Sequence, residues 1–533
     1  MLNDFKQPIR HEMHFGRMVR CHTNRAPTVH ALLRSAAEHA PERVAVVAGD
    51  LRLTYEELGD KVERIASAWV ARDISKGDRL AILIGNRPEF LFTILAAARI
   101  GVIVVPLNPR QKLPEIQFML QKCEAKAIVF EASMAEEVPK AETLPLLSRR
   151  FVVSGETEGA EPFDWLAEAP FSASFAEVAE PHEDDPFCIL YTSGTTGEPK
   201  GATLSQLGVV HSVAHYRHGF GLRDGDVAAL AVPASHVTGL VAILLAAIGV
   251  AGTTVMMTDF KARDLLALID RERVTYTLMV PAMYNLCLLA LDSVEADLSS
   301  WRVGGFGGAP MPDISITRLA EKIPGLGLFN IYGATETTSP ATILRADQLA
   351  ARADSVGQPV DCADILIVDE DGHEVPRGQC GEVLIGGPMT ISAYWNNAEA
   401  NASAFIGGYW RSGDIGSMDE EGYLRISDRL KDVINRGGYK IYSLEVEHVI
   451  ARLPGVVECA VVGYPDSVLG ERVAAFVCGS LANAEAAVKA HCARNLSDYK
   501  LPELVVQLDG PLPRNANGKV MKAQLRALVG PGR

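Results

Sequence analysis

The chain has 533 residues, of which 48% are hydrophobic and 22% charged, and it carries a net charge of −15 with a pI near 5.4. This length is enough for at least two buried cores, and the usual size of a domain suggests three or four compact units. The acidic balance argues against an extended nucleic-acid surface, so an anionic ligand has to meet local positive charge and backbone dipoles.

The cysteines and the start of the chain indicate the compartment. The 9 cysteines are scattered from Cys21 to Cys492 without a Cys-x-x-Cys pair. This spacing suggests neither a zinc site nor a disulfide framework, and a reducing cytoplasm is the expected location. Residues 1–10 mix charged and polar side chains, so no secretory signal is expected. Residues 237–250 are apolar, but they are shorter than the roughly 20 residues that a membrane span requires. We predict a buried core helix there and no membrane span.

Short β-branched runs alternate with longer amphipathic stretches along much of the chain. Helices are predicted at residues 55–72 and 89–98, and strands at residues 44–47, 80–84, 102–106, 127–130, 187–190, 227–232 and 275–280. Such alternation indicates layered α/β subdomains with parallel sheet. At residues 365–385 the pattern changes to short strands with turns, which indicates a small β-rich subdomain.

A domain boundary is predicted near residues 427–431, after a turn at 419–422 and a strand at 423–426. The residues that follow contain their own strand and helix patterns and suffice for a small α+β domain. We therefore expect a large N-terminal domain at residues 1–428 and a small C-terminal domain at residues 429–533.

A glycine-rich loop, Tyr-Thr-Ser-Gly-Thr-Thr-Gly-Glu-Pro-Lys-Gly at 191–201, follows the apolar run 187–190. Its glycines let backbone N–H groups approach phosphate oxygens, while its hydroxyls donate and its lysine adds a cation. It is not the common P-loop, because Pro199 precedes the lysine and Gly201 follows it. The alternative is a flexible surface loop. The candidate phosphate-binding residues are Thr192, Ser193, Gly194, Thr195, Thr196, Gly197 and Lys200.

A second block, Asn-Ile-Tyr-Gly-Ala-Thr-Glu at 330–336, suits a nucleotide. An adenine can stack on Tyr332 beside Gly333, and Asn330 can exchange hydrogen bonds with the base edge. Glu336 offers a hard oxygen ligand for Mg²⁺. The alternative is that Tyr332 is ordinary core and Glu336 a solvated charge at a helix start.

Together the two blocks resemble the adenylate-forming superfamily of acyl-CoA synthetases, luciferases and peptide-synthetase adenylation domains. The resemblance covers nearly all of the chain, since Leu-Thr-Tyr-Glu-Glu-Leu at 53–58 and Val-Pro-Leu-Asn-Pro at 105–109 also look like the family's early segments. It implies an AMP-binding N-terminal domain followed by a mobile C-terminal one. It also implies that adenine lies against Tyr332, that magnesium lies near Glu336, and that Thr335 and Glu336 serve in catalysis.

The resemblance also assigns the acyl pocket. Gly-Gly-Ala-Pro at 307–310 is similar to the stretch that lines the other adenine face and the acyl pocket, although an ordinary loop is the alternative. His236 lies where the family often has an aromatic or histidine wall for the acyl group, although such a histidine is also commonly structural. The residues assigned to adenine are Gly308, Ala309 and Pro310, and those assigned to the acyl group are His236, Val237, Gly307, Gly333, Ser339 and Pro340.

Three residues near the predicted boundary are assigned by the same resemblance. Asp414, in Tyr-Trp-Arg-Ser-Gly-Asp, looks like the carboxylate that accepts hydrogen bonds from both ribose hydroxyls, and a turn residue is the alternative. Arg429 would reach the ribose or a phosphate. Lys431 occupies the hinge on which the small domain turns. A solvated charged face is the other interpretation of this cluster.

Two further segments complete the assignment. Gly437, Gly438 and Lys440 match the loop that faces coenzyme A, where paired glycines leave room for a thin pantetheine arm, although a plain glycine turn is an equally good account. Relatives often carry Asn in place of Lys440 and Pro in place of Ser443. Lys519, in Pro-Arg-Asn-Ala-Asn-Gly-Lys, resembles the cation that stabilises charge on the α-phosphate, and a disordered tail is the alternative.

The predicted activity is that of an acid–CoA ligase that uses ATP, Mg²⁺ and coenzyme A and forms AMP through an acyl adenylate. The expected partner is a small-molecule carboxylic acid, and its body is expected to be apolar or aromatic because residues 280–289 lack the arginine of malonate-specific relatives. The Pro-x-x-x-x-Gly-Lys pattern ending at Lys519 resembles the mark for a protein lysine acetyltransferase. The oligomeric state is not readable from the sequence.

Two alternatives stay open. One is an enzyme that loads a separate carrier protein, although the chain ends soon after Lys519 without a fused carrier segment. The other is a non-catalytic nucleotide sensor, which the presence of both Glu336 and Lys519 disfavours.

Overall fold

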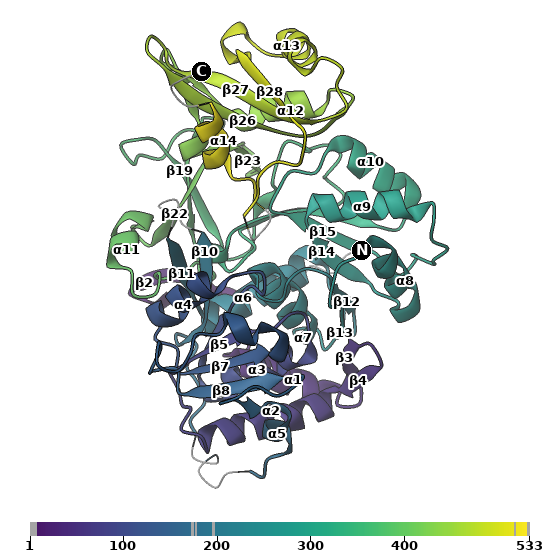
Figure 1. Ribbon diagram of the computed structural model, residues 1–533, viewed down its shortest axis with the longest axis vertical. Coiled ribbons are helices and arrows are strands. Elements are labelled where there is room, and N and C mark those ends of the chain that lie inside the picture. The colour runs from purple at the N-terminus through teal and green to yellow at the C-terminus, as the bar shows by residue number, and fades with distance from the viewer. Residues whose placement is uncertain (1–7, 172–174, 176–177, 194–197, 516–518, 530–533) are drawn as a thin grey trace. The chain divides into compact units, whose positions relative to one another are not determined.

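The computed structural model describes residues 8–171, 175, 178–193, 198–515 and 519–529. Its contacts divide the chain into two compact units (Figure 1). The first comprises residues 1–365 and 385–410, and the second comprises residues 366–384 and 411–533. The boundary predicted between residues 428 and 429 marks the expected start of the mobile C-terminal domain, and it stays a prediction.

A seven-stranded sheet forms one layer of the first unit, in the order β11-β10-β6-β5-β7-β8-β9. Every neighbouring pair is parallel except β10 and β11, as the alternating pattern predicts. Apolar side chains of α4 pack against this sheet, which explains why its central strands are continuously hydrophobic. The strands are β5 (Arg79–Leu83), β6 (Ile103–Pro106), β7 (Ala127–Glu131), β8 (Arg149–Val153), β9 (Glu161–Pro162), β10 (Pro186–Ser193) and β11 (Pro199–Ser205).

A nine-stranded sheet forms the second layer, in the order β18-β17-β16-β15-β14-β12-β13-β3-β4. The run from β16 to β3 is parallel, so the carboxyl ends of these strands meet at one edge. The strands are β3 (Val44–Ala48), β4 (Leu51–Thr54), β12 (Val227–Leu230), β13 (Thr253–Met256), β14 (Tyr276–Met279), β15 (Val303–Gly307), β16 (Gly327–Tyr332), β17 (Thr342–Leu344) and β18 (Gln358–Pro359).

Helices connect these strands. The predicted helix at residues 55–72 is α2 (Tyr55–Val70), whose start is fixed by a capping box between Thr54 and Glu57. The others in the first unit are α1 (Val29–His39), α3 (Pro88–Ile100), α4 (Leu113–Lys122), α5 (Asp164–Glu168), α6 (Gln206–Phe220), α7 (Ala246–Ile248), α8 (Ala262–Glu272), α9 (Pro281–Leu291), α10 (Asp313–Lys322) and α11 (Ala398–Ala404).

The apolar segment at residues 237–250 folds as predicted into a buried helix. It consists of the π-helix Thr238–Leu245 followed by α7, and residues 239–248 are all buried. Among the described residues, no helix combines the length and apolarity that a bilayer crossing needs.

A hairpin of β1 (Ile9–His14) and β2 (Arg17–His22) begins the described part of the chain. Val19 and Cys21 of β2 pack against Leu207 of α6. The His22 backbone N–H donates to His211 Nε2 at 3.2 Å. These contacts fix β2 against α6.

A five-stranded sheet, in which β22 pairs antiparallel with β21 and with β23, confirms the predicted β-rich segment. It is ordered β19-β20-β22-β21, with β23 beside β22. The strands are β19 (Asp364–Val368), β20 (Gly381–Gly386), β21 (Phe405–Ile406), β22 (Tyr409–Met418) and β23 (Leu424–Arg429).

The C-terminal part of the second unit is a sheet with helices on both faces. Successive residues of β26 and β27 point to opposite faces, so Val461 and Val477 pack with α12 and α13, while Val462 and Phe476 pack with Leu525 of α14. The elements are β24 (Ile434–Arg436), β25 (Tyr439–Ile441), α12 (Ser443–Ala451), β26 (Val456–Asp466), β27 (Gly470–Gly479), α13 (Ala484–Asn495), β28 (Leu504–Leu508) and α14 (Lys522–Leu528).

Candidate functional site

Two of the predicted blocks lie side by side at the carboxyl edge of the nine-stranded sheet. Parallel pairing of β15 and β16 sets Gly307 opposite Ile331. A side chain at Gly307 would place its Cβ 2.6 Å from the Ile331 carbonyl oxygen, which explains why this position is glycine. Gly308 has a left-handed φ of 77°, and Gly308, Ala309 and Pro310 are exposed. This edge is where ligands bind in open α/β sheets.

The same edge carries residues assigned to the acyl group. Val280 follows β14, and its Cγ1 lies 3.9 Å from the Cβ position of Gly308. His236 follows β12 and is half-buried, while Val237 is buried. His236 Nε2 lies 3.2 Å from the side-chain nitrogen of Asn108, which follows β6. Because an amide nitrogen only donates, Nε2 accepts this hydrogen bond. The seven-stranded sheet thus holds His236 in place.

Glu336 and Thr192, predicted to bind magnesium and phosphate, are brought together in the first unit. Glu336 lies in the 3₁₀ turn Thr335–Thr337 and is 8% exposed. Its Oε1 accepts hydrogen bonds from the Thr192 hydroxyl at 3.2 Å and from the Tyr394 hydroxyl at 3.0 Å. Lys200 Nζ lies 5.5 Å from the centre of the Tyr394 ring. A carboxylate this buried needs such donors.

Tyr394 is a residue that the sequence did not single out. Its hydroxyl also accepts a hydrogen bond from Trp410 Nε1 at 3.2 Å. Burial and the nearby Glu336 carboxylate raise the pKa of Tyr394 well above its ordinary value, so the phenol stays a donor. A single tyrosine in a loop has no local signal for this role.

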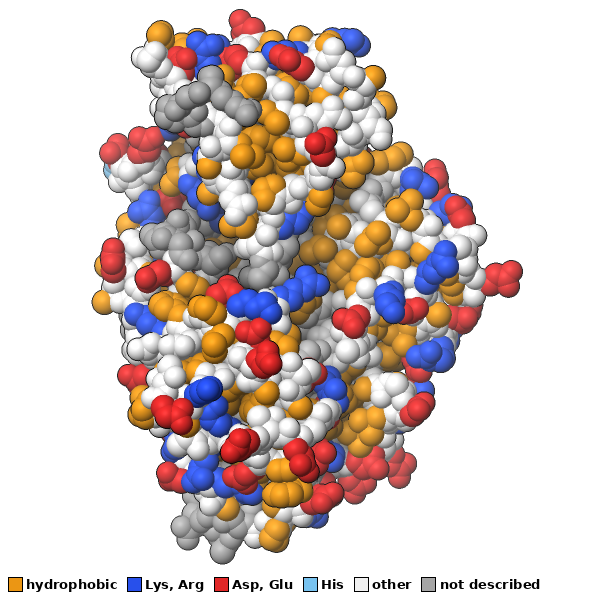
Figure 2. Space-filling view, viewed as in Figure 1, with side chains coloured by type: hydrophobic (Ala, Val, Ile, Leu, Met, Phe, Trp, Pro, Cys, Tyr) orange, Lys and Arg blue, Asp and Glu red, His pale blue; other side chains and the backbone are white. Residues whose placement is uncertain are grey.

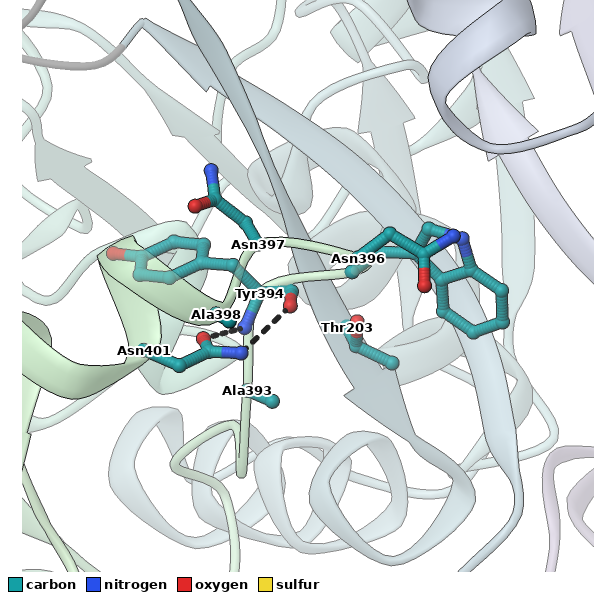
Figure 3. A pocket seen from close by; sticks show the side chains of 8 residues that line it. Thr203, Ala393, Tyr394, Asn396, Asn397, Ala398 and Asn401 are labelled. Carbon is teal, nitrogen blue, oxygen red and sulfur yellow. Dashed lines mark hydrogen bonds between the residues drawn. The ribbon is translucent and has the colours of Figure 1, made fainter.

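The loop that carries Tyr394 is fixed by Asn401 of α11. As Figure 3 shows, the Asn401 amide accepts from the Tyr394 backbone N–H at 2.7 Å and donates to its carbonyl oxygen at 3.1 Å. This loop also borders a hollow of about 630 Å³. None of the predicted site residues lines that hollow, whose walls are Thr203, Ala393, Tyr394, Trp395, Asn396, Asn397, Ala398 and Asn401.

The predicted glycine-rich loop is shorter than expected. Strand β10 runs to Ser193 and β11 begins at Pro199, with Thr192 opposite Lys200 and Ser193 opposite Pro199. Both ends of the segment 191–201 therefore belong to paired strands, with Thr192 on β10 and Lys200 on β11. Gly194, Thr195, Thr196 and Gly197 lie outside the described residues.

The remaining nucleotide and acyl candidates follow β16. Tyr332 is half-buried and pairs with Thr342 of β17. The Asn330 side chain donates to the Ser355 carbonyl oxygen at 3.2 Å, so its amide already has a protein partner. Gly333 lies close to the acyl segment, because a Cβ there would lie 3.2 Å from Pro340 Cα. Ser339 Oγ lies 2.8 Å from the Tyr216 hydroxyl of α6.

In the second unit, the two predicted ribose contacts pair with each other. Asp414 of β22 stands opposite Arg429 of β23, and Asp414 Oδ1 lies 2.7 Å from Arg429 Nε. Asp414 is 4% exposed. Arg429 also donates to the Ser412 carbonyl oxygen at 3.2 Å. The pair is therefore oriented before any ligand arrives, and a ribose would have to share the carboxylate with Arg429.

The predicted hinge and coenzyme A residues lie on exposed turns of this unit. Lys431 is exposed in the 3₁₀ turn Leu430–Asp432, and its carbonyl oxygen accepts from Arg526 at 3.3 Å. Gly437 and Gly438 join β24 to β25 with φ of 58° and 89°. No atom of the described residues lies within 4 Å of a Cβ built at Gly438. Lys440 Nζ lies 2.7 Å from Glu370 Oε1, and both side chains are exposed.

Lys519 is joined to Asn515 by two hydrogen bonds. Its backbone N–H donates to Asn515 Oδ1 at 3.0 Å, and the Asn515 N–H donates to the Lys519 carbonyl oxygen at 3.0 Å. The residue is exposed. Residues 516–518 lie outside the described part. These two hydrogen bonds hold the backbone of Lys519 beside Asn515.

A buried polar network accounts for Ser443, where relatives often have proline. The Ser443 hydroxyl lies 3.0 Å from Asp428 Oδ1 and 2.7 Å from Lys522 Nζ, and Lys522 also pairs with Glu447 at 2.7 Å. Burial raises the pKa of Asp428 and of Glu447, while Lys522 opposes the shift. Ser443 therefore joins β23, α12 and α14.

Comparisons with known proteins agree with this geometry. Residues 33–395 match the AMP-binding enzyme family, and residues 445–519 match the AMP-binding enzyme C-terminal domain. The chain is 35% identical over 500 residues to a long-chain-fatty-acid–CoA ligase of Mycobacterium tuberculosis, covering 93% of this chain and 97% of that protein. It is 33% identical over 497 residues to a feruloyl-CoA synthase of Amycolatopsis, covering 93% of this chain and 97% of that protein.

Among solved structures, o-succinylbenzoate CoA synthetase of Bacillus subtilis, in complex with its acyl-adenylate intermediate, is similar to this chain with a TM-score of 0.82. The two are 29% identical, and the match covers 94% of this chain and 98% of that chain. The predicted resemblance, the mixed α/β fold and the reaction class are thereby confirmed. The chain belongs to the AMP-binding enzymes and is an acid–CoA ligase that activates a carboxylic acid with ATP through an acyl adenylate.

Proposed function

We propose that the acid is a monocarboxylate with an apolar or aromatic body, bound at the carboxyl edge of β12, β14 and β15. The observation that carries this is the position of Val280, which is 44% exposed and borders Gly308. Residues 280–291 contain no lysine or arginine for a second carboxylate. Figure 2 shows hydrophobic side chains gathered over α9 and α10. An apolar body needs no ionic partner there.

The names of sequence relatives at 33–35% identity support the same class, whereas o-succinylbenzoate CoA synthetase, at 29% identity, is named for an acid with two carboxylates. The sequence relatives include ligases for long-chain fatty acids, ferulate and indoleacetate. These acids share one carboxylate and a body that carries no second one. Fatty and aryl acids are therefore the two groups to be compared by experiment.

In the proposed reaction, a carboxylate oxygen attacks the α-phosphorus of ATP, and the bond to the bridging oxygen breaks to release pyrophosphate. The coenzyme thiolate then attacks the acyl carbon, and AMP leaves with the electron pair. The thiol proton passes to solvent. When bound, magnesium would neutralise the negative charge of the phosphates. Glu336 and Thr192 are oxygen donors of the kind that Mg²⁺ prefers, and they would hold it.

The chain's own residues have distinct proposed roles in the first unit. Thr192 and Tyr394 orient the Glu336 carboxylate, and Lys200 adds positive charge beside it. Tyr332 would carry the adenine. His236, held by Asn108, would form one wall of the acyl pocket. Thr335 is proposed to serve beside Glu336 in catalysis.

The second unit would supply the ribose and phosphate contacts and the coenzyme site. The preformed Asp414–Arg429 pair supports a ribose role, since Arg429 holds the carboxylate in one orientation. Lys519 would stabilise charge on the α-phosphate in the adenylation transition state. Lys431 is the proposed hinge. The open space at Gly438 supports a pantetheine arm near Gly437, Gly438 and Lys440.

Acylation of Lys519 by a protein lysine acetyltransferase is the proposed regulation. Lys519 is exposed, which supports access by such an enzyme. Acylation would remove the positive charge and should therefore inhibit adenylation while sparing thioester formation from supplied acyl-AMP. Acetylated protein of verified stoichiometry that still releases pyrophosphate at the full rate would contradict this role. The cytoplasmic location stays a prediction.

Pyrophosphate release over a graded panel of acids tests the substrate class. Medium-chain fatty and aryl acids should exceed dicarboxylates such as malonate in kcat/KM, and coenzyme A should accept the product. A dicarboxylate that outperforms every monocarboxylate would contradict the proposed pocket. Turnover with a carrier protein but not with coenzyme A would instead favour carrier loading.

A further inference from the structure

Four histidines gather inside the first unit, and none of them is among the residues assigned to nucleotide and acid. His22 ends β2, while His211, His215 and His218 lie on α6. The ring centre of His22 lies 5.7 Å from that of His211, 5.8 Å from that of His215 and 5.4 Å from that of His218. Burial lowers the pKa of His22, His211 and His215, so these three rings are neutral.

The rings of two of these histidines make no hydrogen bond to the described residues. His22 is 0% exposed and His215 is 1% exposed. Within the described part of the chain, neither ring nitrogen of His22 and neither ring nitrogen of His215 has a hydrogen-bond partner. Burying polar nitrogens without partners is unfavourable, and such groups require an explanation. His211 differs, because its Nδ1 lies 2.9 Å from the Leu207 carbonyl oxygen and its Nε2 accepts from the His22 N–H.

Asp361 and Cys362, which follow β18, complete the cluster. Ligand atoms of His22, His215 and Cys362 all lie within 4.8 Å of one another, and so do those of His22, His218 and Asp361. Asp361 Oδ2 lies 3.8 Å from His22 Nε2 and 3.0 Å from His218 Nδ1. Cys362 is buried, whereas the Asp361 side chain is 38% exposed. The cluster therefore has a closed interior and an opening at Asp361.

We propose that this cluster is a Zn²⁺ site in which His22, His215 and Cys362 are ligands and Asp361, oriented by His218, closes the fourth position. Two imidazoles, a thiolate and a carboxylate form a donor set typical of zinc. The thiolate and the carboxylate together balance the charge of the dication, which is required in a buried site. Nitrogen and sulfur donors also discriminate against the Mg²⁺ that accompanies ATP.

The protonation states suit this assignment. Burial lowers the pKa of His22 to about 4, so its imidazole is neutral and has a lone pair for a metal at pH 7. Burial raises the pKa of the Cys362 thiol to about 12 without a metal. A bound cation reverses this, because a coordinating thiol is deprotonated. Zinc binding would therefore transfer the Cys362 proton to solvent.

Such an ion would join three segments that are distant in the sequence: the end of β2, the middle of α6 and the loop after β18. The cysteine spacing predicts no zinc site. It does not reveal the proposed one, because only one of the proposed ligands is a cysteine and the others come from remote segments. Residue Tyr216, next to His215 on α6, contacts Ser339 of the predicted acyl pocket. Zinc would thus stabilise the helix that supports that pocket.

The full-length enzyme, stripped with a chelator, tests the proposal by titration with Co²⁺ and Zn²⁺. We expect one ion per chain, a thiolate-to-cobalt charge-transfer band in the absorption spectrum, displacement of cobalt by zinc, and a Tm that rises with zinc concentration. About one proton per zinc should be released. Mg²⁺ alone should reproduce none of these effects. Binding well below one equivalent, or cobalt binding without the charge-transfer band, overturns the site.

Variants identify the ligands. Cys362→Ser should abolish the charge-transfer band, and His22→Gln and His215→Gln should weaken binding by more than the roughly 10–100-fold caused by losing an outer-shell partner. His211→Gln is the matched control in the same cluster, and Cys123→Ser is the control for a buried thiol elsewhere. Both should keep full stoichiometry and the cobalt band. Retention of the band in Cys362→Ser overturns the assignment. The cobalt spectrum of the unsubstituted enzyme decides the question if a variant does not fold.

Discussion

Removing the Tyr394 hydroxyl tests how the Glu336 carboxylate is held. Tyr394→Phe keeps the ring and deletes one hydrogen bond to a buried carboxylate and one acceptor for Trp410 Nε1. A hydrogen bond to a charged group contributes about 1.5–3 kcal/mol, and an orphaned buried donor costs about 1–3 kcal/mol. The free energy of unfolding should therefore fall by about 2.5–6 kcal/mol, measured by urea denaturation.

The same substitution should change the magnesium dependence of adenylation. Without the Tyr394 hydroxyl, Thr192 is the donor that remains to Glu336 Oε1 among the described residues, so the apparent affinity for magnesium and ATP should weaken while coenzyme A saturation stays the same. ATP–pyrophosphate exchange at varied Mg²⁺ measures this effect. Tyr276→Phe is the matched control, because Tyr276 is also buried and, among the described residues, its hydroxyl donates one hydrogen bond, to the Ile243 carbonyl oxygen, at 3.2 Å. The control should lose about 1 kcal/mol and keep its magnesium dependence. The reasoning fails if both variants lose the same stability and neither alters the magnesium dependence.

Three further predictions follow from the second unit and the first. Lys519→Ala should slow adenylation by about 10²–10³-fold while ATP still binds, as the loss of one preorganised transition-state charge does; near-normal pyrophosphate release would contradict it. Gly438→Trp should let acyl-AMP accumulate while thioester formation stalls. Gly372→Trp, at another open left-handed glycine with a φ of 83°, controls for backbone strain, and equal loss of both half-reactions would place the coenzyme elsewhere. Burial, followed by the Arg99 charge, lowers the pKa of His30 from 6.5 to about 4. The unfolded chain therefore takes up this proton first, and the free energy of unfolding should fall between pH 6.5 and about 4. His30→Gln should reduce that fall in urea denaturation at pH 7 and pH 5, and an unchanged difference would refute the assignment.

Local pattern was sufficient for much of the fold. Helices α2 and α3 lie where the amphipathic stretches predict helices, and the apolar runs at residues 102–106 and 127–130 became buried parallel strands. These features depend on the period of the side chains along a few turns or residues, which any short window of sequence contains. The glycines at 307 and 308 were also identified from the sequence as part of the site. A side chain at Gly307 would collide with the Ile331 carbonyl oxygen, and Gly308 has a left-handed φ that other residues rarely adopt.

The tertiary structure alone decided which of these pieces meet. Thr192 and Glu336 are separated by 144 residues, and Glu336 and Tyr394 by 58, yet they share one carboxylate oxygen. Asp414 and Arg429 became partners through the register of β22 and β23, whereas the sequence had assigned each of them to a ligand. Residues His22, His215 and Cys362 come from three separate segments. Such long-range contacts depend on strand order, on strand register and on which face of a helix is buried. These features are set by packing of the whole chain rather than by any local pattern.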